Sequence, residues 1–181
     1  RKWEENFGPT YFSFNRGDVH YVCINNCFFH RGMAYYSPGE LRERQVKWLK
    51  QDLTLTPKNM KVVLCYHIPF TFGNAPFSKA KPLANANEQG HYSSSRLSLL
   101  LSLLKPFKGG YELFCGHTHF ACNHEINYQG EDVMEHCHAA ACGNIWQSNI
   151  NICGTPNGYY VYSFVGTSIS NCYYKGTFWD K

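Results

Sequence analysis

The sequence predicts a mixed α/β fold with a parallel core and a mostly β C-terminal part, and three observations support this prediction. An apolar, β-branched run, a leucine-rich helical segment and a second apolar run follow one another over residues 60–119. This alternation is typical of a βαβ unit with parallel strands. Residues 120–174 show short runs with turn residues between them, which favours antiparallel pairing. With 44% hydrophobic and 17% charged residues, the chain has the composition of a globular protein.

The first part of the chain predicts a hairpin followed by one helix. Polar and aromatic residues alternate over residues 10–15, Arg16-Gly17-Asp18 supplies a turn, and residues 19–25 form the returning strand. Residues 26–37 show no hydrophobic period, and we expect a loop there. A helix is predicted from Pro38 to about Leu53, because its apolar residues fall on one broad face.

Histidines follow both apolar runs of the predicted βαβ unit. The run over residues 62–66 ends at His67, and the second run ends at Gly116, where glycine can take the backbone angles of a sharp turn. His117 and His119 come next, with one residue between them. Open α/β sheets build their sites at the carboxyl ends of parallel strands. Imidazoles at that edge can bind one metal ion or two adjacent ions.

A long segment without a hydrophobic period separates the two histidine motifs. Residues 71–90 predict a loop that forms a rim over the site, since loops of this length in compact domains are usually functional or mobile. Asn87 and His91 are weak candidates for substrate contacts, and solvated loop residues are the alternative reading. Ser93-Ser94-Ser95 can cap the next helix, which is predicted to run through Leu104 between two layers.

The C-terminal part predicts short strands and two hairpins. The strands are expected over residues 120–127, 132–141 and 159–165. Tyr128-Gln129-Gly130-Glu131 is a plausible turn of the first hairpin, and residues 159–174 form the second. His136 and His138 alternate on one face of a strand, where we favour a structural role over metal binding.

Composition also narrows the classes of partner. The nine cysteines contain no CxxC pair, which argues against a structural zinc ribbon. Cys137 with Cys142, or Cys153 with Cys172, could pair in an oxidising compartment, and the spacing leaves this open. The net charge of +4 includes no basic stripe, so we expect no nucleic-acid binding. No run of about 20 apolar residues is present, so we expect no membrane span.

These residues carry a family resemblance. Cys65-Tyr66-His67-Ile68-Pro69 and the later Gly116-His117-Thr118-His119 resemble the second half of the calcineurin-like metallophosphoesterase signature. Residues 7–14 and 45–49 are similar to segments of the same family. Residues 143–159 resemble the start of a C-terminal domain found in bacterial, often exported, members.

The resemblance implies part of a metallophosphoesterase-type β-sandwich flanked by helices, with a mostly β C-terminal extension. Residues 1–141 would be the distal half of the catalytic domain, and residues 142–181 the start of an incomplete β-rich domain. His67 and His117 would bind one divalent metal ion and His119 a second, with Mn, Fe, Zn or similar ions as the two cofactors. The expected activity is hydrolysis of phosphate mono- or diesters on a small phosphorylated substrate.

The chain departs from the family where the earlier motifs should stand. DxH, GDxxD and GNH are absent, so the metal-binding carboxylates, the asparagine and the histidine that protonates the leaving group have no counterpart. We therefore expect a C-terminal fragment of a longer enzyme, which needs the N-terminal half of the same polypeptide and is inactive by itself. No residue of this chain is assigned as catalytic. The sequence does not decide the cellular compartment. The resemblance of residues 143–159 to exported members implies export.

The alternative function is a noncatalytic or single-metal-binding module with a structural or interaction role. It rests on the missing carboxylates. Three histidines could still hold one zinc ion at an open site. Upstream DxH and GNH motifs would decide for the enzyme.

Overall fold

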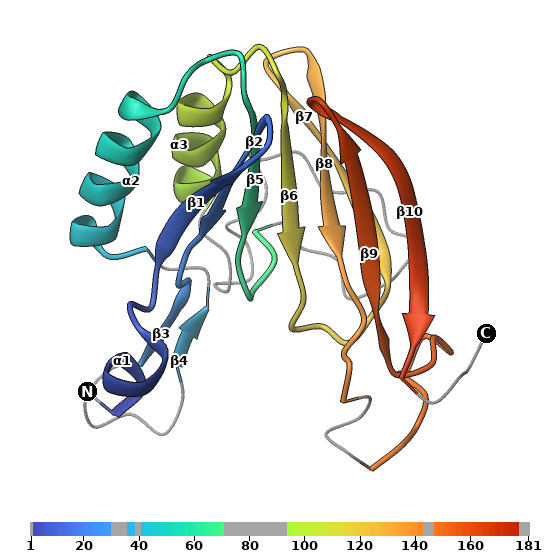
Figure 1. Ribbon diagram of the computed structural model, residues 1–181. Coiled ribbons are helices and arrows are strands. Elements are labelled where there is room, and N and C mark those ends of the chain that lie inside the picture. Colours follow the sequence, from blue (N-terminus) through green and yellow to red (C-terminus); the bar gives the residue numbers. More distant parts are fainter. Residues whose placement is uncertain (1, 30–35, 39–40, 71–93, 143–146, 178–181) are drawn as a thin grey trace.

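A six-stranded mixed sheet forms the centre of the molecule (Figure 1). The computed structural model describes residues 2–29, 36–38, 41–70, 94–142 and 147–177. In spatial order the strands are β1 (Phe12–Arg16), β2 (Val19–Cys23), β5 (Lys61–Cys65), β6 (Tyr111–Cys115), β8 (Glu131–Cys137) and β7 (Cys122–Tyr128). The remaining elements are α1 (Lys2–Phe7), β3 (Cys27–Phe29), β4 (Tyr36–Pro38), α2 (Glu43–Leu55), α3 (Ser94–Leu104), β9 (Gly158–Val165) and β10 (Ser168–Gly176).

The predicted parallel core is present. β2, β5, β6 and β8 run parallel to one another, and β1 and β7 pair antiparallel at the two edges. The chain passes from β6 to the edge strand β7 and then returns as β8, which lies between them. The carboxyl ends of the four parallel strands consequently meet at one edge of the sheet, at the bottom of Figure 1.

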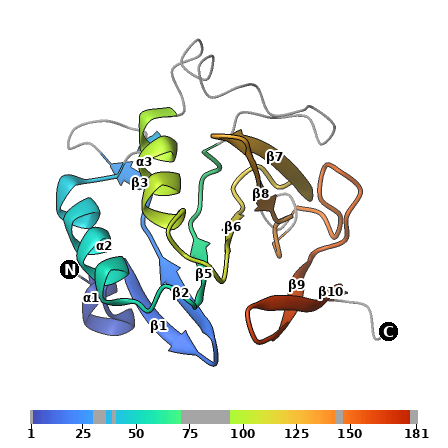
Figure 2. The same ribbon diagram turned by 90° about the horizontal axis from the view of Figure 1, so that it is seen from above.

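Two layers cover the central sheet from opposite sides. Helices α2 and α3 pack on one face, and the β9–β10 hairpin lies on the other (Figures 1 and 2). On the helix side, buried Leu49, Leu53 and Leu101 join the inward-facing residues Val62 and Leu64 in one core. On the hairpin side, the ring of Phe114 stacks on that of Tyr162 with centroids 4.5 Å apart. The predicted α/β class is thus confirmed.

Two elements differ from the sequence prediction. Helix α2 begins at Glu43 instead of Pro38, because Pro38 lies in β4 and pairs with Cys27. The segment expected to be a loop over residues 26–37 contains the short hairpin β3–β4. Its aromatic residues favour strand structure, but three residues per strand are too few to show a period. None of the helices within the described ranges is long and apolar enough to cross a bilayer.

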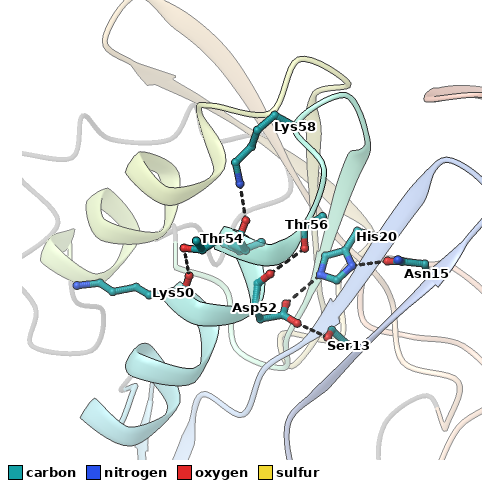
Figure 3. Close-up of polar contacts among 9 residues, drawn as sticks. Ser13, Asn15, His20, Lys50, Asp52, Thr54, Thr56 and Lys58 are labelled. Carbon is teal, nitrogen blue, oxygen red and sulfur yellow. Dashed lines mark hydrogen bonds and ion pairs between the residues drawn. The ribbon is translucent and has the colours of Figure 1, made fainter.

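A partly buried polar cluster ties the first hairpin to the end of α2 (Figure 3). Asp52 accepts hydrogen bonds from Ser13 Oγ at 2.6 Å and pairs with His20 Nε2 at 2.9 Å. The other ring nitrogen of His20 lies 2.6 Å from Asn15 Oδ1. Because His20 is buried, the carboxylate of Asp52 supplies the partner that water would otherwise provide.

Replacing Asp52 with Ala should lower the free energy of unfolding by about 2–3 kcal/mol, because Ser13 and His20 lose a charged partner inside the protein. Urea unfolding measures this change. The matched control is Glu43→Gln, whose side chain pairs with Arg96 but is 82% exposed, so its effect should stay below about 1 kcal/mol. Equal losses in the two variants would contradict a structural role for the cluster.

Candidate functional site

The loops after β5 and β6 bring two of the predicted ligands into contact. His67 Nε2 and His117 Nδ1 are 3.0 Å apart, and their rings meet edge to face with centroids 4.9 Å apart. The Gly116 N–H donates to the His67 carbonyl at 3.0 Å, so the β5–β6 ladder continues into the loops. The parallel pairing of the two strands therefore positions both imidazoles.

The turn that carries His117 and His119 has an unusual backbone. His117 has a φ of 70° and His119 a φ of 60°, which lie in the left-handed region that non-glycine residues seldom adopt. We expected Gly116 to take such angles, but it has a negative φ, and the two histidines carry the turn instead. Strain of this kind persists only where the surroundings hold it, and it concentrates at functional sites.

A chain of hydrogen bonds from β8 holds this turn. The Phe120 N–H donates to Thr118 Oγ1 at 3.3 Å, and the Thr118 hydroxyl lies 3.1 Å from Cys137 Sγ. Cys137 Sγ donates in turn to the Gly116 carbonyl at 3.2 Å. Because Cys137 is buried at the end of β8, its hydrogen bonds hold the turn against the sheet.

Asn26 holds the loop of His67 from the opposite side. Its Oδ1 accepts hydrogen bonds from the N–H groups of His67, at 3.2 Å, and Ile68, at 3.0 Å. Its Nδ2 donates to the Ile68 carbonyl at 2.6 Å. Asn26 has no exposed surface, so all three bonds are shielded from water. It fixes the backbone from which the His67 ring projects.

Two further polar residues support this region, one at the neighbouring Asn25 and one at the His67 loop, and the sequence analysis missed them together with Asn26. Gln45 on α2 makes two hydrogen bonds with the backbone of Asn25, at 2.7 and 2.8 Å. Glu135, fully buried on β8, accepts hydrogen bonds from the Tyr66 hydroxyl and from the Phe70 N–H at 2.8 Å. Glu135 could have been noticed in the sequence, because a carboxylate within an apolar strand pattern indicates a buried polar contact.

The electrostatics of the site favour neutral imidazoles. Burial lowers the pKa of His67, and the nearby His119 lowers it further. Burial also lowers the pKa of His117, with His67 and His119 adding to the effect. A neutral imidazole has a free lone pair, which is the form that binds a metal ion.

The distance between the two ring nitrogens fits one metal ion. Neighbouring ligands at about 2.1 Å from an ion lie about 3.0–3.4 Å apart, and His67 Nε2 and His117 Nδ1 match this spacing at 3.0 Å. His119 lies close enough to both rings to lower their pKa values. Among the described residues no group of three or more His, Cys, Asp or Glu side chains is arranged to hold a metal ion. The histidines therefore fit part of a metal site.

The other candidates lie apart from this pair or outside the structure. Asn87 and His91 fall outside the described residues. His136 contacts Asn123 Oδ1 at 2.9 Å and Glu112 Oε2 at 3.3 Å, on the face covered by the hairpin. His138 Nε2 lies 2.7 Å from the Tyr162 hydroxyl, which links β8 to β9.

Replacing Asn26 with Ala should lower the free energy of unfolding by about 3 kcal/mol, because buried backbone groups of His67 and Ile68 lose their partners. The same variant should speed amide hydrogen exchange at these two residues, which mass spectrometry or NMR can follow. Asn123→Ala, on the exposed edge strand, is the control and should cost less than about 1 kcal/mol. Unchanged exchange at residues 67 and 68 would contradict the positioning role.

His138 gives the molecule a pH dependence. Burial, with His136 nearby, lowers its pKa to about 4, so the folded state stays neutral while the unfolded chain takes up a proton below about pH 6.5. Stability should therefore fall as the pH drops from about 6.5 to about 4, by roughly 2 kcal/mol given the partial exposure of the ring. His138→Gln should lose less stability than the wild type between pH 7 and pH 4.5 in urea unfolding. Parallel losses would show that His138 does not cause the dependence.

Comparison with known proteins adds independent support for the resemblance. A family model described as the C terminal of calcineurin-like phosphoesterase matches residues 135–181, from within β8 through the β9–β10 hairpin. A search of the curated proteins finds no match. The matched segment lies outside both histidine loops, so two separate parts of the chain indicate the same family. The match confirms the resemblance over this segment, which is similar to the C terminal of calcineurin-like phosphoesterase.

Proposed function

We propose that the protein is part of a metal-dependent hydrolase of phosphate mono- or diesters, to which this chain contributes three histidine ligands. His67 and His117 bind one divalent ion, and His119 binds a second. The observation that carries this proposal is the 3.0 Å separation of His67 Nε2 and His117 Nδ1, on loops from neighbouring parallel strands. The family match at residues 135–181 supports the reaction class.

The chain contributes neutral ligands on a rigid edge. Lowered pKa values favour the neutral form of His67 and His117. Asn26 fixes the backbone of the first loop, and Cys137 fixes that of the second. When bound, a pair of divalent ions would hold the phosphate oxygens and supply a hydroxide nucleophile. Because the histidine loops are already ordered, less conformational entropy would be lost when the ions bind.

The remaining ligands must come from outside the histidine loops. Carboxylates usually complete such dinuclear sites, and none of the described Asp or Glu residues groups with the histidines to hold an ion. We propose that polypeptide beyond this sequence, the N-terminal half of the same protein, supplies them. The proposed substrate is a small phosphorylated molecule. Nucleic acid is not the expected partner, because the net charge of +4 includes no basic stripe.

The same observation favours a second candidate for the chain as it stands. With two imidazoles in contact and no carboxylate beside them among the described residues, the chain could bind a single ion and serve as a structural or interaction module. This candidate predicts metal binding without phosphoester hydrolysis, even when the polypeptide is extended upstream.

Zinc binding tests the ligand assignment. Isothermal titration and elemental analysis should show that His67→Ala and His117→Ala each weaken Zn²⁺ binding by about tenfold or more, since each removes one of few ligands. The matched control is His136→Gln, which lies on the hairpin face and should bind zinc like the wild type. Equal binding in all variants would refute the assignment.

Hydrolysis distinguishes the two candidates. An upstream-extended polypeptide should hydrolyse a generic phosphodiester with Mn²⁺ and hold two ions. His117→Ala should abolish that turnover. One ion and no turnover in the extended polypeptide would favour the module.

A further inference from the structure

Three cysteines lie side by side on neighbouring strands, next to the turn that carries His117 and His119. Cys115 on β6 is the register partner of Cys137 on β8, and Cys137 is the register partner of Cys122 on β7. We call these three residues the cysteine row. All of them are free thiols in the structure. Cys137 supports the proposed metal site through its hydrogen bond to the Gly116 carbonyl, but that proposal includes no disulfide.

The strand register of Cys122 and Cys137 is compatible with a disulfide. Residues directly opposite each other on antiparallel strands have Cα atoms about 4.5–5.5 Å apart, within the range of about 4.4–6.8 Å that disulfides span. Both side chains point to the same face of the sheet because they are register partners. Cys122 is half-buried at the start of the edge strand, so a small oxidant can reach it first.

We propose that Cys122 and Cys137 form a reversible disulfide that alters the turn of residues 116–119. The other register pairs are less suited. Cys115 is buried on an interior strand, and its Sγ already donates to the His136 carbonyl at 3.5 Å. Cys23 and Cys65 are partners on the parallel strands β2 and β5, away from this turn.

The oxidant that the reaction needs is a low-molecular-weight disulfide. The Cys122 thiol loses its proton as it attacks one sulfur of that molecule, and the other half leaves as a thiolate. His124 Nε2 lies 3.4 Å from Cys122 Sγ and can stabilise the attacking sulfur. The Cys137 thiolate then attacks the mixed disulfide at Cys122 and releases the second half. Both cysteines are oxidised, and the small disulfide is reduced to two thiols that carry away the two protons.

Oxidation removes a hydrogen bond from the strained turn. Cys137 Sγ–H donates to the Gly116 carbonyl at 3.2 Å, and a disulfide sulfur has no proton to donate. The new bond also draws Cys137 Sγ towards β7 and away from Thr118 Oγ1. Because His117 and His119 hold left-handed angles that need this support, the turn should loosen. An effect on metal affinity would rest on the proposed function, but the loosening itself does not.

Peptide mapping tests the bond. The reduced, metal-free chain is treated with oxidised glutathione and digested without reduction by a protease that cleaves after glutamate. Cleavage at Glu125 and Glu135 separates Cys122 from Cys137, so the disulfide appears as a linked pair of peptides whose fragmentation identifies the bonded sulfurs. We expect Cys122 joined to Cys137, with reversal by dithiothreitol. A bond confined to Cys115 or to the Cys23–Cys65 pair, or no bond at all, would overturn the proposal.

Hydrogen exchange tests whether the turn of residues 116–119 loosens. It uses the same wild-type samples, so the result does not require that any variant folds. Amides of residues 116–120 should exchange at least about threefold faster after oxidation, while those of residues 24–26 stay the same. Cys122→Ser should abolish both the linkage and the change, and Cys172→Ser, on exposed β10, should preserve them. A disulfide without faster exchange at residues 116–120 would refute the coupling. No metal is present, so either result is independent of the proposed hydrolysis.

Discussion

The parallel pairing of β5 with β6 is the constraint on which the rest of the site depends. Cys65 is the register partner of Phe114, so the two strands end almost level and their loops begin at the same height. The Gly116 N–H then adds one more hydrogen bond to the His67 carbonyl. Two histidines fifty positions apart in the sequence are thereby placed within 3.0 Å of each other.

Buried polar side chains on or just after the flanking strands fix the geometry of this pair. Asn26 follows β2 on one side of the pair, and Glu135 lies on β8 on the other. Each bonds to the backbone of the first loop, Asn26 at residues 67 and 68 and Glu135 at Phe70. In a dry interior such bonds are strong when satisfied and costly when broken. The loop therefore has one favoured conformation before any ligand arrives.

The sequence predicted the parts of this arrangement that depend on local pattern and pairing. The parallel strands, the histidines at their ends and the turn around Gln129 follow from apolar runs and turn residues that stand close together. The supporting residues could not be predicted in this way, because Asn26 and Gln45 act across long sequence separations and their types are common in loops and helices. Similarly, the left-handed angles of His117 and His119 occur in a turn that hydrogen bonds to Cys137 of β8 hold in place, and such contacts cannot be read from local sequence.

β8 ends within the family-matched segment and also contacts the histidine loops. Alternate residues of this strand face opposite layers: Glu135 and Cys137 point towards the core and the histidine loops, and His136 contacts Glu112 on the hairpin side. The segment that matches the phosphoesterase family begins at Glu135, the residue that holds the backbone of Phe70. The family-matched segment therefore contacts the loop of His67 directly, although the two lie far apart in the sequence. One strand thus joins the C-terminal hairpin and both histidine loops into a single structural unit.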